Sequence, residues 1–120
     1  MPCLVISTNI PKERVTPEVM TSFSKQFSTV IGKPEQYCMV QVIPEQLMTF
    51  GGTFDPCASC TLVSLGQLGV AENKAIAKKI YEFTEKILGV PTDRMYIQFV
   101  DKPSSEIGYK GTTFHELLGR

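Results

Sequence analysis

The chain carries a weak internal repeat, and this repeat constrains its fold more than any other feature. The segment GKPEQYCMVQVI, which starts at Gly32, aligns without gaps on GVPTDRMYIQFV, which starts at Gly89, an offset of 89 − 32 = 57 residues. At the same offset, CLVIS (residues 3–7) aligns on CTLVS (residues 60–64). Because the agreement extends to both ends of the unit, it favours a duplication over chance similarity between β-rich segments.

Each unit has the pattern of a strand, a helix and a second strand. In the first unit, strands over 2–8 and 37–43 flank a helix that begins at Thr16 and Pro17 and is ended by Gly32. In the second unit, strands over 57–65 and 94–100 flank a helix over 72–88 that is ended by Gly89. Apolar residues recur at helical spacing in both helices, which is typical of a core face: Met20, Phe23, Phe27 and Val30, then Ile76, Ile80, Phe83 and Ile87.

These patterns predict an α/β (α+β) fold in a single domain over 1–120. Residues 1–56 form the first βαβ unit, 57–114 the second, and 115–120 a C-terminal extension. Because a helix that connects parallel strands makes a right-handed crossover, two such units side by side give a four-stranded sheet with both helices on one face.

The other face of that sheet is left bare. Since strand 37–43 is apolar on both sides, we expect self-association, with edge strands at 46–50 and near Gly108 available to pair with a neighbour. The patterns leave dimer and trimer open.

Composition excludes several classes of function. The 12 basic and 12 acidic residues cancel, so nothing favours a nucleic-acid or anionic-membrane partner. The apolar stretches are too short to insert in a membrane, and the start of the chain lacks a signal-peptide pattern, which predicts a cytoplasmic protein. The four cysteines are expected to be reduced thiols.

Several blocks of the sequence resemble the family of macrophage migration inhibitory factor and D-dopachrome tautomerase, in order and in spacing. They are MPCLVISTNIP, IGKPEQY, VIPEQLMTFGGTFDPCASC, SLGQLG, DRMYIQF and IGYKGTTF, and together they cover nearly the whole chain. The retained CxxC at residues 57–60 makes the migration inhibitory factor branch the more similar one. The resemblance implies a tautomerase fold assembled as a homotrimer, with three active sites at subunit interfaces.

The resemblance implies a keto-enol tautomerase of the phenylpyruvate tautomerase or L-dopachrome isomerase type, with Pro2 as its catalytic base. A methionine before a small residue is ordinarily removed, which would give Pro2 a free secondary amine. An apolar pocket and a nearby cation lower the pKa of an amine, so a neutral base can exist at physiological pH. No metal and no cofactor is needed. If Met1 is retained, Pro2 is an amide and cannot act as a base.

The resemblance also implies substrate-binding residues for a small aromatic α-keto acid or a dopachrome-like compound. Lys33 would hold a substrate oxygen, Ser64 would lie beside the proline, and the backbone N–H of Leu65, an isoleucine in the best-known members, would bind the substrate. Tyr96 and Gln98 share one face of a strand and would reach into a neighbouring subunit's pocket, although position 98 is commonly asparagine. The aromatic and apolar rim would comprise Tyr37, Ile107, Tyr109, which replaces a tryptophan of many members, and Phe114.

Two other functions stay open at this point. Family members also act as cytokine-like ligands of cell-surface receptors and leave the cell without a signal peptide, which is compatible with an enzyme. A thiol oxidoreductase would use Cys57 and Cys60, but a reactive CxxC normally begins a helix, whereas these cysteines open a predicted strand. Zinc is disfavoured because His115 alone supplies no second ligand pair.

Family chains usually stop near the equivalent of Phe114, so residues 115–120 depart from the pattern. We expect these residues either to fray in solvent or to pack Leu117 and Leu118 against an adjoining subunit.

Overall fold

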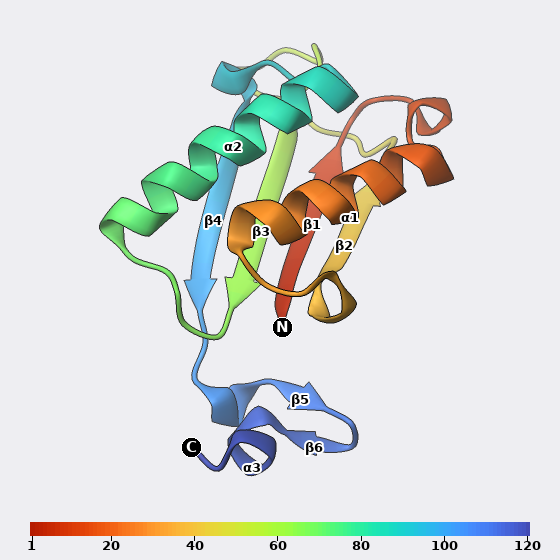
Figure 1. The fold of residues 1–120 in the computed structure, drawn as a ribbon. Helices are drawn as coiled ribbons and strands as arrows, with labels where there is room; N and C mark the ends of the chain where they lie inside the picture. Colours follow the sequence, from red (N-terminus) through yellow and green to blue (C-terminus); the bar gives the residue numbers. More distant parts are fainter.

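The computed structural model describes residues 1–120, and a four-stranded sheet forms its centre (Figure 1). The strands lie in the order β2-β1-β3-β4. The pairs β1/β2 and β3/β4 are parallel, and the central pair β1/β3 is antiparallel. The strands are β1 (Pro2–Thr8), β2 (Met39–Ile43), β3 (Ala58–Ser64) and β4 (Met95–Asp101).

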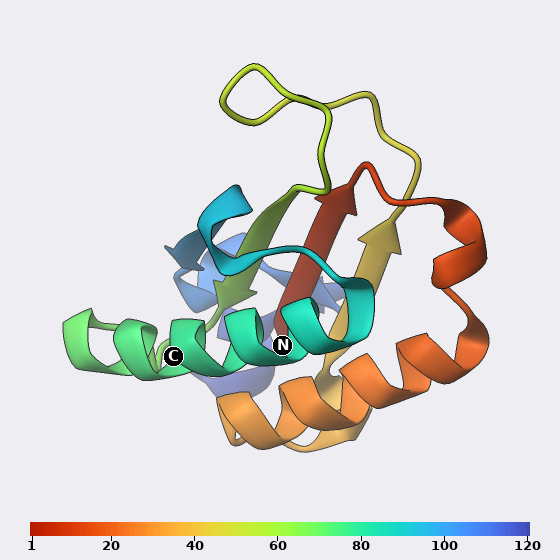
Figure 2. The same cartoon turned by 90° about the horizontal axis from the view of Figure 1, so that it is seen from above.

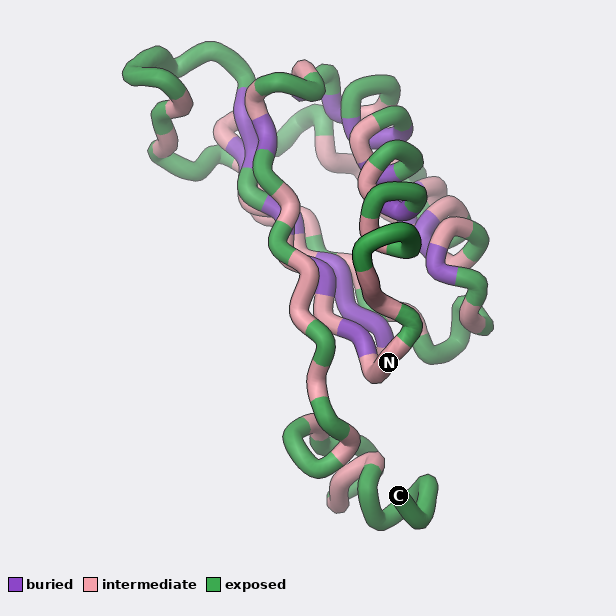
Figure 3. The backbone as a smooth tube through the Cα atoms, turned by 90° about the vertical axis from the view of Figure 1, so that its left-hand side faces the viewer, coloured by how far each residue is buried: buried purple, intermediate pink, exposed green.

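Both long helices, α1 (Pro17–Ile31) and α2 (Val70–Leu88), lie on the same face of the sheet (Figure 2). The predicted fold, two βαβ units with both helices on one face, is therefore confirmed. The opposite face carries no helix, and the tube drawn by burial shows its strands uncovered on that side (Figure 3).

The internal repeat is visible in the structure. A 3-10 turn over Glu35–Tyr37 leads from α1 to β2, and its counterpart over Thr92–Arg94 leads from α2 to β4. A further 3-10 turn over Lys12–Arg14 precedes α1. The two units thus share a helix, a turn and a strand at the same offset.

The helix ends follow the predicted capping residues. The Thr16 hydroxyl accepts a hydrogen bond from the Val19 N–H at 3.2 Å, and Pro17 is the first residue of α1. Gly32 and Gly89 end α1 and α2 in the left-handed conformation, with φ of 69° and 74°. Helix α2 begins at Val70, two residues earlier than predicted. No side chain caps it, so no capping residue marked this start in the sequence.

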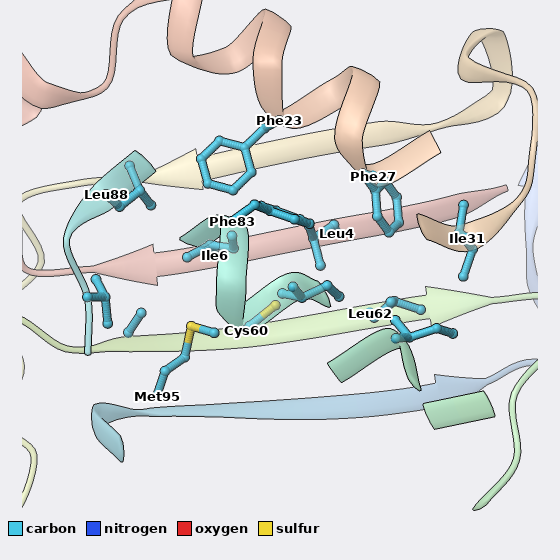
Figure 4. Close-up of a cluster of buried hydrophobic side chains, with 14 of the residues drawn as sticks. Leu4, Ile6, Phe23, Phe27, Ile31, Cys60, Leu62, Phe83, Leu88 and Met95 are labelled. Atoms are coloured by element: carbon cyan, nitrogen blue, oxygen red, sulfur yellow. The ribbon is translucent and has the colours of Figure 1, made fainter. Parts of the chain in front are cut away.

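The core lies between the sheet and the two helices. Phe23 of α1 meets Phe83 of α2 edge to face, with ring centroids 5.2 Å apart and planes at 76°. Figure 4 shows these rings above the side chains that β1 and β3 direct toward the helices. The fully buried side chains of this core include Leu4, Ile6, Phe23, Phe27, Cys60, Leu62, Ile80 and Leu88.

Polar contacts fix how the two units join. The buried Thr8 hydroxyl donates to the Cys57 carbonyl oxygen at 2.7 Å, and the Asn9 side-chain oxygen accepts the Cys57 N–H at 2.9 Å. These bonds lie where β1 ends and β3 begins. They therefore hold the antiparallel register in which Thr8 pairs with Ala58.

Two sequence-based expectations about strands differ from the structure. The strand predicted over 37–43 begins at Met39, because Tyr37 belongs to the 3-10 turn that follows Pro34. Residues 46–50 form no strand in the protomer. They belong to a loop whose carbonyl groups accept hydrogen bonds from the Arg94 guanidinium at 3.0–3.4 Å, among them those of Phe50 and Asp55.

The C-terminal part stands away from the sheet (Figures 1 and 3). A 3-10 turn over Ser104–Glu106 leads into a small hairpin of β5 (Gly108–Tyr109) and β6 (Thr112–Thr113), and then into a short helix, α3 (Phe114–Leu118). The strand near Gly108 thus pairs within its own chain. Fraying of the extension was the wrong expectation, since a capped helical turn forms there. None of the helices meets the length and hydropathy that crossing a bilayer requires.

Candidate active site

The candidate site lies at the end of the sheet where β1 begins and β3 ends. Pro2 pairs with Ser64 across the antiparallel ladder, and both residues are buried. A cavity of about 600 Å³ opens beside them, between the main sheet and the C-terminal part. Of the predicted site residues, five line it: Lys33, Tyr37, Leu65, Tyr109 and Phe114.

The Lys33 ammonium group sits among three neutral oxygen atoms. Its Nζ donates to the Met1 carbonyl oxygen at 3.3 Å, to the Ser64 hydroxyl at 3.4 Å and to the Leu65 carbonyl oxygen at 3.3 Å. These bonds connect the end of α1 to the start of β1 and to the end of β3. Lys33 therefore contacts the residue before the predicted base and two of the predicted binding positions at once.

The end of α1 sets the position of Lys33. Gly32 reverses the chain in the left-handed conformation, so that both its N–H and the Lys33 N–H point back to the Ser28 carbonyl oxygen, at 2.9 and 3.3 Å. The Ser28 hydroxyl then donates to the Lys33 carbonyl oxygen at 2.6 Å. The lysine backbone is thus anchored, and its side chain extends from a fixed point.

No carboxylate neutralises Lys33. The one ion pair in the structure joins Lys102 to Glu106, in the linker after β4, at 3.5 Å. No anionic partner offsets the positive charge of the Lys33 ammonium group, and partial burial weakens solvent screening around it. This end of the cavity is therefore suited to an anion or to an oxygen atom that gains negative charge.

The amino terminus lies in the same environment. Partial burial, and second the charge of Lys33, lower the pKa of the Met1 amino group below its usual value. The Met1 carbonyl carbon is bonded to the Pro2 nitrogen, and its oxygen is the one that Lys33 contacts. After removal of Met1, the Pro2 amine would be the terminal group at this place, with the Lys33 ammonium nearby.

Aromatic rings form the outer part of the cavity. Tyr109 and Phe114 stack with ring centroids 5.2 Å apart and planes at 9°, and the Lys110 ammonium lies 5.5 Å from the centre of the Tyr109 ring. Tyr37 is 44% exposed on the opposite side, in the turn after Pro34. A flat apolar group could enter between these side chains.

Three predicted site residues lie elsewhere in the protomer. Tyr96 and Gln98 are exposed on the bare face of the sheet, where Tyr96 packs against Phe50 with ring centroids 5.1 Å apart. Ile107 is half-buried, and its carbonyl oxygen accepts the Phe114 N–H at 3.0 Å without lining the cavity. Within the protomer, Tyr96 and Gln98 therefore do not contribute to the cavity.

The two cysteines of the CxxC are buried and not bonded to each other. Cys57 precedes β3 and Cys60 lies inside the core, and both are free thiols. Burial raises the pKa of the Cys60 thiol to about 12. Because the thiolate is the reactive species, this environment disfavours redox chemistry. No group of three or more His, Cys, Asp or Glu side chains is placed to hold a metal ion.

Sequence reasoning missed several residues of the cavity wall. Helix α3 contributes Leu117 and Leu118, and the residues around it contribute Lys110 and Arg120. The family pattern gave no signal for the last two leucines because it ends before them. From the sequence they were considered only as residues that pack against an adjoining subunit, and the fold that brings them beside Met1 of their own chain was not predicted.

The sequence is similar over nearly its whole length to one family of known proteins. The sequence model described as macrophage migration inhibitory factor (MIF) matches residues 1–115. The chain is 39% identical over 114 residues to macrophage migration inhibitory factor of Rattus norvegicus, across 95% of this chain and 99% of that protein. It is 40% identical over 114 residues to the homolog of Trichuris trichiura, across 95% of this chain and all of that protein.

Solved structures give the same result. The macrophage migration inhibitory factor of Trichinella spiralis superposes with a TM-score of 0.89 at 32% identity, over 93% of this chain and 99% of that chain. The homologue from Prochlorococcus marinus superposes with a TM-score of 0.87 at 28% identity, over 93% and 98% of the two chains.

Proposed function

Because the chain belongs to the macrophage migration inhibitory factor family, we propose that it is a keto-enol tautomerase with Pro2 as its base. The family includes tautomerases. The observation that carries the proposal is the contact of the Lys33 ammonium with the Met1 carbonyl oxygen at 3.3 Å. It brings an unneutralised cation to an oxygen that lies two bonds from the Pro2 nitrogen.

The proposed reaction moves one proton and needs no other reagent. The neutral Pro2 nitrogen takes a proton from the carbon next to the ketone of an aromatic α-keto acid such as phenylpyruvate. The electron pair of that C–H bond forms the C=C bond, and the carbonyl oxygen takes the negative charge. Lys33 stabilises this oxygen, and the proton carried by Pro2 then neutralises the enolate oxygen.

The cavity suits such a substrate. Lys33 lies at its inner end for the carboxylate or the ketone oxygen, and the stacked Tyr109 and Phe114 rings offer a flat surface for an aryl group. A dopachrome-like compound has the same combination of an anion and a flat apolar body. We include both substrate classes in the proposal.

We further propose that the active protein is a homotrimer with sites between subunits. The bare face exposes Tyr96 at 71% and Met39 at 61%, and β2 and β4 are open edge strands. Large apolar side chains on an uncovered sheet face favour association. In a trimer, Tyr96 and Gln98 of one subunit would complete the cavity of the next.

An assay of processed protein tests the enzymatic proposal. Intact mass first establishes that Met1 is lost, and absorbance then follows tautomerisation of hydroxyphenylpyruvate and of dopachrome with its carboxylate free. We expect turnover by the processed protein and a loss of at least about a hundredfold in Pro2→Gly. Turnover that persists in Pro2→Gly, or in protein with residues fused before Pro2, contradicts the proposal.

Subunit mixing tests the shared site. Light scattering should give about 40 kDa, three times the 13.3 kDa of one chain. Pro2→Gly protein and Tyr96→Ala/Gln98→Ala protein, each impaired alone, should regain activity after they are unfolded and refolded together. A mixture with no more activity than its parts means that each site lies within one chain.

A signalling ligand is the second candidate, and one observation favours it. The loop before β3 exposes Leu47 at 94% and Phe54 at 68%, although Arg94 holds its backbone by several hydrogen bonds. A rigid loop with exposed apolar side chains is suited to binding another protein. Secretion without a signal peptide would accompany this role.

The two candidates separate by variant. We expect Pro2→Gly to retain an effect on macrophage migration, and Leu47→Ser/Phe54→Ser to lose that effect while it keeps tautomerase activity. If Pro2→Gly removes both activities and the loop variant neither, the loop is not the ligand surface.

A further inference from the structure

The last five residues of the chain lie beyond the family match, yet they continue the ordered C-terminal helix and turn. The family model ends at residue 115, and α3 continues to Leu118. The Thr113 hydroxyl caps α3 by accepting the Glu116 N–H at 3.4 Å, and Gly119 ends it with a φ of 71°. The Ser104 hydroxyl donates to the Arg120 carbonyl oxygen, so the end of the chain is tied back.

This segment faces the candidate active site. Leu117, Leu118 and Arg120 line the same cavity as Met1 and Lys33, whereas His115 and Glu116, on the same helix, do not. Figure 1 shows α3 below the start of β1. The helix therefore presents two leucines to the cavity and its polar residues elsewhere.

The chemistry of the cavity wall indicates what it would bind. Lys33, Lys110 and Arg120 line it, and no Asp or Glu side chain does. Leu117 and Leu118 are 45% and 50% exposed, so each keeps apolar surface that an occupant could cover. An anion with an apolar body satisfies both parts of this wall.

We propose that residues 117–120 form a wall that selects the size of the substrate. Leu117 and Leu118 cover the aryl group of an α-keto acid whose acidic end is held at Lys33. The inference rests on the proposed tautomerase function, and it adds that α3 makes this chain prefer a large apolar substituent over a short one.

A matched pair of double variants tests the wall. Leu117→Ala/Leu118→Ala removes the apolar surface, and His115→Ala/Glu116→Ala changes the same helix away from the cavity. Two substrates are compared: hydroxyphenylpyruvate, by absorbance, and 2-oxobutanoate, by deuterium exchange at its third carbon in NMR. We expect the leucine variant to lose about tenfold in kcat/KM for the aryl substrate and less than twofold for the short one.

The control variant should keep kcat/KM for both substrates. If the leucine variant loses kcat/KM equally for both substrates, or for neither, the proposal of a wall is wrong. Binding of phenylacetate, an unreactive anion with an aryl group, is measured by calorimetry in parallel. It should weaken about tenfold in the leucine variant alone; unchanged affinity, or no binding to the unmodified protein, also overturns the wall. Absence of turnover with both keto acids counts against the tautomerase function instead, and phenylacetate binding then decides the wall by itself.

Discussion

The Lys33 ammonium nitrogen and the Met1 carbonyl oxygen are 3.3 Å apart, although 32 positions separate the two residues along the chain. The contact places a cation at the amino terminus, where it lowers the pKa of the terminal amine after the larger effect of burial. A site of this kind needs the charge near the base but not bonded to a carboxylate. Both conditions are met here.

Removal of the Lys33 charge should therefore weaken the stabilisation of the substrate's enolate oxygen and raise the pKa of the base. We expect Lys33→Met to lower kcat/KM for hydroxyphenylpyruvate by about a hundredfold, because the enolate oxygen loses its stabilising donor. The exposed Lys25 of α1 supplies the matched control, since Lys25→Met removes a charge from the helix that precedes Lys33. Equal activities of the two variants, measured by absorbance, would show that Lys33 does not contact the substrate.

Two glycines test whether the turn after α1 positions Lys33. Gly32→Ala and Gly89→Ala each force alanine into the left-handed conformation, which costs about 1 kcal/mol of stability by urea unfolding. A methyl group at Gly32 meets nothing within 4 Å, and the nearest atoms to one at Gly89 belong to the Arg14 guanidinium end. We expect only Gly32→Ala to reduce kcat/KM, several-fold, because Lys33 follows it directly. A similar loss of kcat/KM in Gly89→Ala would show that lower stability, and not the position of Lys33, causes the effect.

The buried Cys60 should be chemically silent. Because burial raises its pKa to about 12, almost none of it is thiolate at pH 8, and iodoacetamide should label it only in urea. Its ionisation also predicts how stability depends on pH. Above about pH 9 the thiol loses its proton in the unfolded chain but not in the folded one, so the free energy of unfolding should fall as pH rises further. Rapid labelling of Cys60 in the folded protein, or catalysed reduction of insulin, would revive the thiol oxidoreductase hypothesis.

The sequence predicted the parts of the fold that depend on local chemistry. Thr16, Gly32 and Gly89 act at helix ends through their own side chains or backbone freedom, so their roles could be inferred from neighbouring residues. The antiparallel pairing of β1 with β3 could not, because it depends on contacts such as Thr8 with Cys57 that join residues 49 positions apart.

The candidate site divides in the same way. The family resemblance supplied Lys33, Tyr109 and Phe114, which do line the cavity. It gave no information on Leu117 and Leu118, since their position depends on how the hairpin β5/β6 folds the C-terminal part toward Met1. Tyr37 was predicted as a residue of the cavity rim, but the sequence placed it at the start of a strand, whereas it lies in a 3-10 turn.

The central claim is an uncharged Pro2 nitrogen at the start of β1, and nitrogen-15 NMR of processed protein labelled in proline measures it most directly. A buried amine beside Lys33 should titrate below the ordinary pKa of about 8 for a terminal amine, and activity should fall as pH drops through that midpoint because a protonated nitrogen accepts no proton. In Lys33→Met the midpoint should move to higher pH. A nitrogen that does not titrate, or that titrates at the same pH in both proteins and above 8, would contradict the account.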